Sequence, residues 1–135
     1  TTTDESAIAP VYDGGSCLYP QADEAIMRDT IDKQPERDFR TFSIPLSSIK
    51  VNGKKINYFD FISSLENADC SKALKRILPK INMDAIFCIV DETPFISDLQ
   101  KQFYKTMLQT RKERILDFAM EKLRKREKAK ELEAR

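Results

Sequence analysis

The 135-residue chain contains no histidine and no tryptophan, and it has only three glycines and three cysteines. Without histidine, and without any Cys-x-x-Cys pair, the usual ligand sets of a zinc site are missing. The glycines, Gly14, Gly15 and Gly53, cannot form a glycine-rich phosphate loop. The odd number of cysteines is typical of a reduced protein, so we expect a cytoplasmic location.

The chain also has no long apolar run, so we expect that it contains no membrane-spanning helix and no signal peptide. The length fits one domain, which would bury about two thirds of its surface on folding. Apolar residues make up 41% of the chain and charged residues 33%, which is a high charged share. We therefore expect a single globular domain with a highly charged surface.

The small net charge conceals an asymmetry between the two parts of the chain. Residues 101–135 carry 12 Lys and Arg against 6 Asp and Glu, whereas the remaining residues carry 11 and 16. A basic tail can meet nucleic acid or an acidic partner. The mixed signs of the tail and its lack of interleaved aromatic residues instead favour a solvated helix face, so we expect no nucleic-acid binding.

The most informative stretch is Ala-Pro-Val-Tyr-Asp-Gly-Gly-Ser-Cys-Leu-Tyr-Pro, residues 9–20. A short apolar strand ends in Asp13, and two glycines follow where the backbone must bend or approach a ligand closely. A carboxylate at such a strand end is a natural ligand for Mg²⁺. Asp-Gly is also a common turn pair, and spacing alone favours a turn in which Asp13 bonds to its own backbone.

This stretch resembles the Ala-Pro-x-Tyr-Asp-x-Gly-Ser-x-Leu segment of HipA-like protein kinases, in particular the compact branch of CtkA-type serine/threonine kinases. The resemblance continues through residues 56–62 and 91–97, and so covers most of the chain up to its charged tail. It implies that Asp13 plays the part of the DFG aspartate, which holds the metal on the nucleotide phosphates. Gly14 and Ser16 would form the small-residue turn beside the nucleotide.

Much of what a kinase needs is missing from this sequence. Phosphoryl transfer also requires a lysine on the nucleotide, a catalytic Asp and a metal-binding Asn. No His-x-Asp motif exists here, and no Asp is followed five positions later by Asn. We therefore expect the C-terminal part of a HipA-like kinase, either excised or naturally without catalysis, that is inactive alone. Mg²⁺, ATP and a protein substrate would belong to the intact kinase.

The predicted fold is α+β and mainly α: a helical C-terminal kinase lobe with a short N-terminal strand pair and one small β-hairpin. Asn52-Gly53 between two short strands predicts a type I′ turn. Asn57, Asn82 and Ser97 are predicted helix caps. The expected elements are a strand at 8–12, helices at 22–31, 58–65, 69–78, 83–91 and from 97 to beyond 123, a charged loop at 32–38, and a short strand or extended segment at 39–43.

Two of these elements carry further expectations. The helices at 58–65 and 83–91 should be buried, because apolar residues surround them, although a strand is the alternative for 83–91. In the long helix Arg111 lies within the apolar arc, either as an internal salt bridge or, the favoured interpretation, as a stem whose head reaches water. Residues 1–124 form the predicted lobe, and residues 125–135 an exposed helical extension or a frayed tail.

The residues leave one functional alternative open. The chain could be a non-catalytic helical module that binds a protein partner, perhaps as a dimer through the long helix. Asp13 would then be tied to its own turn rather than exposed in a cleft. An isolated lobe would also expose apolar surface, which predicts self-association. The phosphorylation target and a toxin–antitoxin partner, both suggested by the bacterial family, are not encoded in any motif.

Overall fold

A computed structural model describes residues 17–44 and 46–135. The described part is mainly helical with one two-stranded antiparallel hairpin, which confirms the predicted fold class. The elements are α1 (Glu24–Asp32), α2 (Gln34–Asp38), the π-helical segment η2 (Phe39–Ser43), β1 (Lys50–Val51), β2 (Lys54–Lys55), α3 (Tyr58–Ser63), α4 (Ala68–Ile77), the 3₁₀ turn η3 (Leu78–Lys80), α5 (Met83–Glu92), α6 (Asp98–Arg111), the π-helical segment η4 (Lys112–Asp117) and α7 (Phe118–Glu133). The predicted N-terminal strand pair lies outside the described residues.

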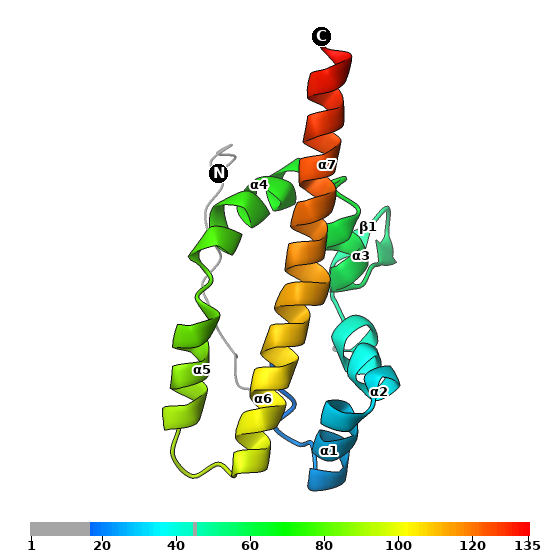
Figure 1. Cartoon of the computed structure of the whole chain (residues 1–135). Helices are drawn as coiled ribbons and strands as arrows, with labels where there is room; N and C mark the ends of the chain where they lie inside the picture. The colour runs from blue at the N-terminus through cyan, green and yellow to red at the C-terminus, as the bar shows by residue number, and fades with distance from the viewer. Residues whose placement is uncertain (1–16, 45) are drawn as a thin grey trace, which may run out of the picture.

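The three segments α6, η4 and α7 form one continuous rod, around which the shorter helices pack (Figure 1). α1 and α5 pack against α6, whereas α3 and α4 pack against the rod further along, at η4 and α7. The C-terminal end of α7 projects beyond the body. No helix of the described chain is long and apolar enough to cross a membrane.

Local sequence signals set most helix starts. Asn57 and Asn82 accept hydrogen bonds from the backbone N–H groups three residues later, which caps α3 and α5 as predicted. Ser97 and Gln100 form a reciprocal capping box at the start of α6. Asn52 and Gly53 have φ values of 53° and 79°, as a type I′ hairpin turn requires.

The predicted loop at 32–38 and the predicted extended segment at 39–43 are both wrong, because this region is helical. Pro35 sits in the first turn of α2, where its missing N–H costs nothing. Arg37 donates from Nη1 to the carbonyl of Ile31 over 2.6 Å, and Arg40 pairs with Glu36 one turn away. The Arg37 contact satisfies a carbonyl at the end of α1 and joins α2 to it, whereas the Arg40–Glu36 pair links η2 to α2.

The core consists of two clusters placed along the rod. The first is formed by Met27, Phe103 and Met107 between α1 and α6. The second contains residues of α7 together with residues from the α3–α4 region, namely Leu65, Leu74, Ala119, Met120 and Leu123. Along the rod, η4 lies between the α6 residues of the first cluster and the α7 residues of the second.

The expectation that α3 and α5 are buried is wrong, because both helices carry exposed apolar side chains and α5 carries more of them. α5 forms as a helix rather than a strand, but Val90 is its one buried residue and Ile89 is 68% exposed. Tyr58 of α3 is 43% exposed. Apolar composition therefore did not imply burial, because the described chain covers only one side of α5, where α6 packs.

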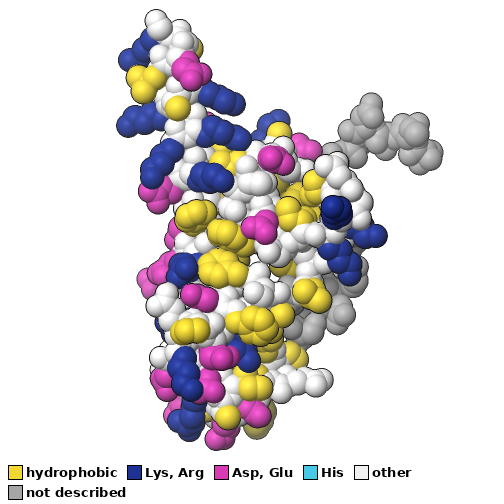
Figure 2. Space-filling view, turned by 90° about the vertical axis from the view of Figure 1, so that its right-hand side faces the viewer, with side chains coloured by type: hydrophobic (Ala, Val, Ile, Leu, Met, Phe, Trp, Pro, Cys, Tyr) yellow, Lys and Arg dark blue, Asp and Glu magenta, His cyan; other side chains and the backbone are white. Residues whose placement is uncertain are grey.

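The start of the charged tail is attached to the body. Lys122 donates to the carbonyl of Ser63 over 2.8 Å, and Arg126 to that of Leu65 over 2.9 Å. Lys75 of α4 forms an ion pair with Glu127. Beyond these contacts α7 continues to Glu133 as an exposed helix whose Lys and Arg side chains gather around its projecting end (Figure 2).

Candidate functional site

The predicted site residues Asp13, Gly14 and Ser16 lie outside the described residues. The described chain begins directly after them, at Cys17. The candidate site is therefore the anchorage of the segment Cys17–Pro20, through which the Asp13 stretch joins the helical body. Arg111 is the one residue singled out from the sequence for a role that the structure places here.

Tyr19, for which no sequence pattern predicted a role, fixes this segment to the body. Its backbone has a φ of 55°, and its hydroxyl lies 2.7 Å from the Arg40 carbonyl and 2.5 Å from that of Ile44. Its ring packs against Phe103 with 6.3 Å between the ring centroids. Burial raises the pKa of the Tyr19 hydroxyl, and the neighbouring Arg111 partly opposes this.

Arg111 holds the same segment from the rod. Its Nη1 donates to the Cys17 carbonyl over 3.0 Å, across a sequence separation of 94 residues. Its guanidinium carbon lies 5.4 Å from the centroid of the Tyr19 ring, within cation–π range. Its Nη2 is buried and has no hydrogen-bond partner among the described residues.

The favoured prediction for Arg111, a head group in water, holds only in part, because the side chain is half-buried and its Nη2 is fully buried. Its alternative, an internal salt bridge, finds no carboxylate partner within the described ranges. The guanidinium instead meets a backbone carbonyl and an aromatic face. Both partners precede residue 20, so no pattern within the long helix could have indicated them.

A cavity of about 340 Å³ lies beside Arg111 and Cys17. Its other lining residues come from η2, η4, α3 and the chain around Ile44, and they are mostly apolar: Thr41, Phe42, Ile44, Tyr58, Ile62, Ile115 and Leu116. Both π-helical segments thus contribute to one cavity. π-helical turns are rare and are found frequently at functional sites.

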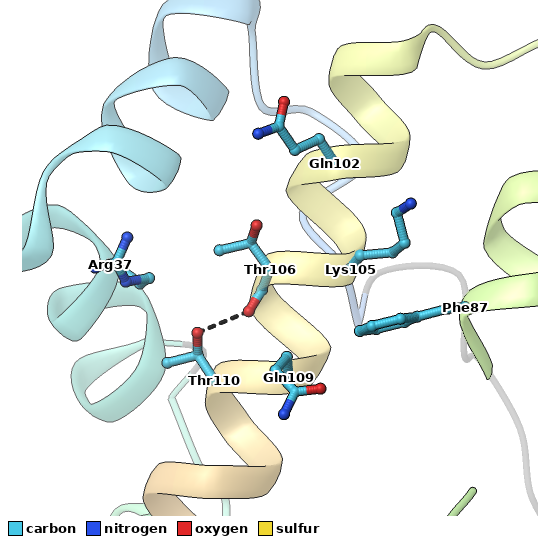
Figure 3. Close-up of a pocket in the computed structure, with 7 residues that line it drawn as sticks. All are labelled: Arg37, Phe87, Gln102, Lys105, Thr106, Gln109 and Thr110. Atoms are coloured by element: carbon cyan, nitrogen blue, oxygen red, sulfur yellow. Dashed lines mark hydrogen bonds between the residues drawn. The ribbon is translucent and has the colours of Figure 1, made fainter. Parts of the chain in front are cut away.

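A second, more polar hollow of about 390 Å³ lies along α6, between α2 and α5 (Figure 3). Its lining residues are Arg37, Phe87, Gln102, Lys105, Thr106, Gln109 and Thr110. Lys105 donates to Asp91 over 2.8 Å, and Arg37 caps α1, so both cations are already held by the protein. The hollow therefore offers mainly amide and hydroxyl groups.

Asp13 could supply one carboxylate ligand to a magnesium ion, but one carboxylate is not a complete metal site. Asp13 is the sole acidic residue between positions 9 and 20, and Mg²⁺ prefers oxygen ligands. Within the described ranges no group of three or more His, Cys, Asp or Glu side chains could hold a metal ion. The described ranges therefore do not form a metal site by themselves.

Comparison with protein-family models finds no match. Over 116 residues the chain is 47% identical to the serine/threonine-protein kinase CtkA of Helicobacter pylori, a match that covers 85% of this chain. It is also similar to the crystal structure of a Helicobacter pylori proinflammatory kinase CtkA, with a TM-score of 0.79 and 44% identity over 87% of this chain. The chain spans 36% of the curated kinase and 43% of the crystallised chain.

Proposed function

Because this chain is a homologue of part of CtkA, a serine/threonine-protein kinase, we propose that it is the C-terminal helical lobe of such a kinase. The observation that supports this most is the 47% identity over 116 residues. In this role Asp13 supplies the carboxylate that corresponds to the DFG aspartate. Gly14 and Ser16 form the turn that approaches the nucleotide, and the substrate is a protein.

Mg²⁺ bound with ATP neutralises the charge that develops on the phosphates during phosphoryl transfer. The part of this chain is to hold the Asp13 carboxylate as an oxygen ligand. The helical body provides the rigid support, since Cys17–Pro20 is anchored to α6 and η2 through Arg111 and Tyr19. The catalytic Asp, the metal-binding Asn and the nucleotide-binding lysine belong to the part of the kinase that precedes Asp13.

We expect the chain to be inactive alone, because it has no His-x-Asp motif and no Asp-x-x-x-x-Asn spacing. The three cysteines support a cytoplasmic location, since Cys17, Cys70 and Cys88 are all free thiols. The projecting basic end of α7 carries Glu side chains among its Lys and Arg, which does not favour nucleic acid as a partner.

The first experiment measures Mg²⁺-dependent ATP binding by calorimetry for this chain and for Asp13→Ala. The same two sequences are then joined to the upstream part of Helicobacter pylori CtkA, which supplies the missing catalytic groups, and are assayed for autophosphorylation. We expect the short chain to be silent, the chimera to be active, and Asp13→Ala to abolish that activity. Full activity of the Asp13→Ala chimera would refute the proposed metal ligand.

A second candidate is a non-catalytic module that binds a protein partner. The observation that favours it is the exposure of apolar side chains at and beyond α5, where Ile89 is 68% exposed and Phe95 is fully exposed. A chimera that folds but remains inactive with Asp13 intact would make this the leading function. The intact Helicobacter kinase serves as the positive control for the assay.

A further inference from the structure

Phe95 lies in the turn between α5 and α6 and is fully exposed to solvent. Its backbone φ is 65°, a left-handed conformation that glycine and asparagine adopt readily and that a bulky side chain adopts at a cost in free energy. Glycine or asparagine would therefore suit this turn better if Phe95 met only water. Aromatic side chains dominate the energetics of protein interfaces, so Phe95 has the features of a side chain that a partner buries.

A pocket of suitable size and chemistry lies elsewhere on the chain, between α3, α4, η3 and η4. Its volume is about 180 Å³, and every residue that lines it is aliphatic or a cysteine, including Cys70, Ala73 and Leu116. For comparison, an apolar cavity of about 150 Å³ can hold a benzene ring. Ile77 also lines the pocket and is 50% exposed, so the pocket can be reached from solvent. We call it the α4 pocket.

The charges around Phe95 and around the α4 pocket are opposite in sign. Residues 91–98 contain no basic residue and three exposed acidic residues, Asp91, Glu92 and Asp98. Residues 71–80 contain no acidic residue and four exposed basic residues, Lys72, Lys75, Arg76 and Lys80. Asp91 and Lys75 also form ion pairs within the chain, with Lys105 and Glu127. Opposite charges around an apolar contact favour the matching orientation of two partners and speed their association.

We propose that Phe95 of one copy of this chain occupies the α4 pocket of a second copy. Phe95 does not reach the pocket of its own chain, because the α5–α6 turn and α4 lie toward opposite ends of the body, with the ten-residue helix α5 between them (Figure 1). If a two-fold axis relates the copies, the contact forms twice and the assembly closes as a dimer. The inference is independent of the proposed function, because neither Phe95 nor the α4 pocket belongs to the Cys17–Pro20 segment.

Sedimentation velocity at a series of concentrations tests the contact on the full chain and three variants. Phe95→Ala removes the inserted ring, and Ala73→Phe fills the pocket from its own wall. Leu132→Ala is the matched control, because Leu132 is an exposed apolar residue on the projecting end of α7. We expect the wild type to dimerise and each of the first two variants to raise the dissociation constant at least about tenfold, as the loss of a central interface residue does. Leu132→Ala should leave it unchanged.

Mixing the two weakened variants gives the sharpest result, because together they retain one intact ring and one intact pocket. Phe95→Ala offers its pocket to Phe95 of the Ala73→Phe chain. We expect a 1:1 heterodimer whose dissociation constant is at least about tenfold lower than that of either variant with itself. Association of Ala73→Phe as in the wild type, or no recovery in the mixture of two folded variants, would overturn the inference.

Cys70 provides a test that needs no substitution, and it decides the matter if Ala73→Phe does not fold. Cys70 lines the α4 pocket, whereas Cys17 is an exposed thiol outside it. Alkylation by iodoacetamide is followed at each cysteine by mass spectrometry of peptides from dilute and concentrated wild-type chain. The rate at Cys70 relative to Cys17 should fall in proportion to the dimeric fraction. Equal relative rates at both concentrations, while the dimer forms, would overturn the inference.

A wild type that stays monomeric would overturn a second copy as the occupant of the α4 pocket. That result would instead favour another protein segment, such as the upstream part of the kinase, as the partner of Phe95. Since none of these measurements follows phosphoryl transfer, their failure leaves the proposed function untouched. Conversely, an inactive chimera would refute the proposed function without affecting the contact between copies.

Discussion

Tyr19 illustrates how one side chain can join distant parts of this chain. Its hydroxyl meets two carbonyls of the η2 region, and its ring contacts both Phe103 and Arg111. None of these partners could have been identified from the neighbouring sequence, because they lie at least 21 residues away. The helix caps Asn57, Asn82 and Ser97 behave differently, since their partners lie three residues further along.

The raised pKa of Tyr19 makes its contribution to stability depend on pH. Burial favours the neutral hydroxyl in the folded state, so the unfolded chain loses this proton at a lower pH, near the ordinary value of about 10. The contribution is therefore complete below pH 10 and is lost as the pH rises further. We expect Tyr19→Phe to cost about 1 kcal/mol of unfolding free energy at pH 7, through the lost hydrogen bond.

Urea denaturation of the wild type and of Tyr19→Phe between pH 7 and pH 11 checks this prediction. The difference in unfolding free energy between the two proteins should shrink above pH 10. Tyr104→Phe is the control at pH 7, because its hydroxyl has no hydrogen-bond partner among the described residues, so this variant should lose less unfolding free energy than Tyr19→Phe. A constant difference for Tyr19→Phe across the whole range would contradict the expected linkage.

The long rod combines inward side chains spaced every four residues with a π-helical segment, η4, in its middle. Its inward residues recur every four positions from Phe103 to Leu123, and this period is longer than the 3.6 residues of an α-helical turn. A straight α-helix would turn such a row away from the core. The wider turn of η4 compensates, so that α6 and α7 both face their clusters.

Deleting the exposed residue Glu113 should convert η4 into ordinary α-helix. Each α-helical residue turns the chain further than a π-helical one, so the shorter segment keeps the orientation of α7 relative to α6, and we expect a loss of less than about 1 kcal/mol in unfolding free energy. Deleting the exposed Glu121, which lies within the regular helix α7, should instead rotate Leu123 by about 100° and cost at least about 3 kcal/mol, comparable to the truncation of a large core side chain. Urea denaturation measures both variants. Equal losses for the two deletions would show that the π turn does not set the alignment.

At the scale of the whole molecule, the described chain covers only one side of α5. α6 packs on that side, whereas Ile89 and Phe95 are exposed. In the proposed kinase this apolar surface would meet another part of the protein or a partner. Without such a neighbour, the most direct way to remove it from water is contact with a second copy of the chain.

We therefore predict that the isolated chain self-associates and that Ile89→Lys weakens this association. Light scattering coupled to size-exclusion chromatography should show a mass above that of the monomer, with at least a tenfold rise in the dissociation constant for the variant, equivalent to about 1.4 kcal/mol. Leu132→Lys is the matched control, because Leu132 is similarly exposed, at 65%, but lies on the projecting end of α7. A clean monomer for the wild type would contradict the prediction.

The sequence by itself determined the features whose causes are local. Helix caps and the Asn52-Gly53 turn depend on groups within a few residues of one another, and these predictions are confirmed. The motif of residues 9–20 indicated the resemblance to kinases because motif residues identify a family without any fold. The predicted roles of Asp13, Gly14 and Ser16 stay predictions, since these residues lie outside the described ranges.

Tertiary structure alone decided which apolar faces are covered and what Arg111 contacts. Burial depends on the neighbours that the chain path supplies, so α5 and α3 could be apolar without being enclosed. The helical state of residues 34–43 depends on Arg37 reaching back to α1 and on Phe42 packing beneath Arg114 of the rod. The tether from Arg111 to Cys17 joins residues 94 positions apart, and only the folded chain brings a guanidinium and a carbonyl so far separated within 3.0 Å.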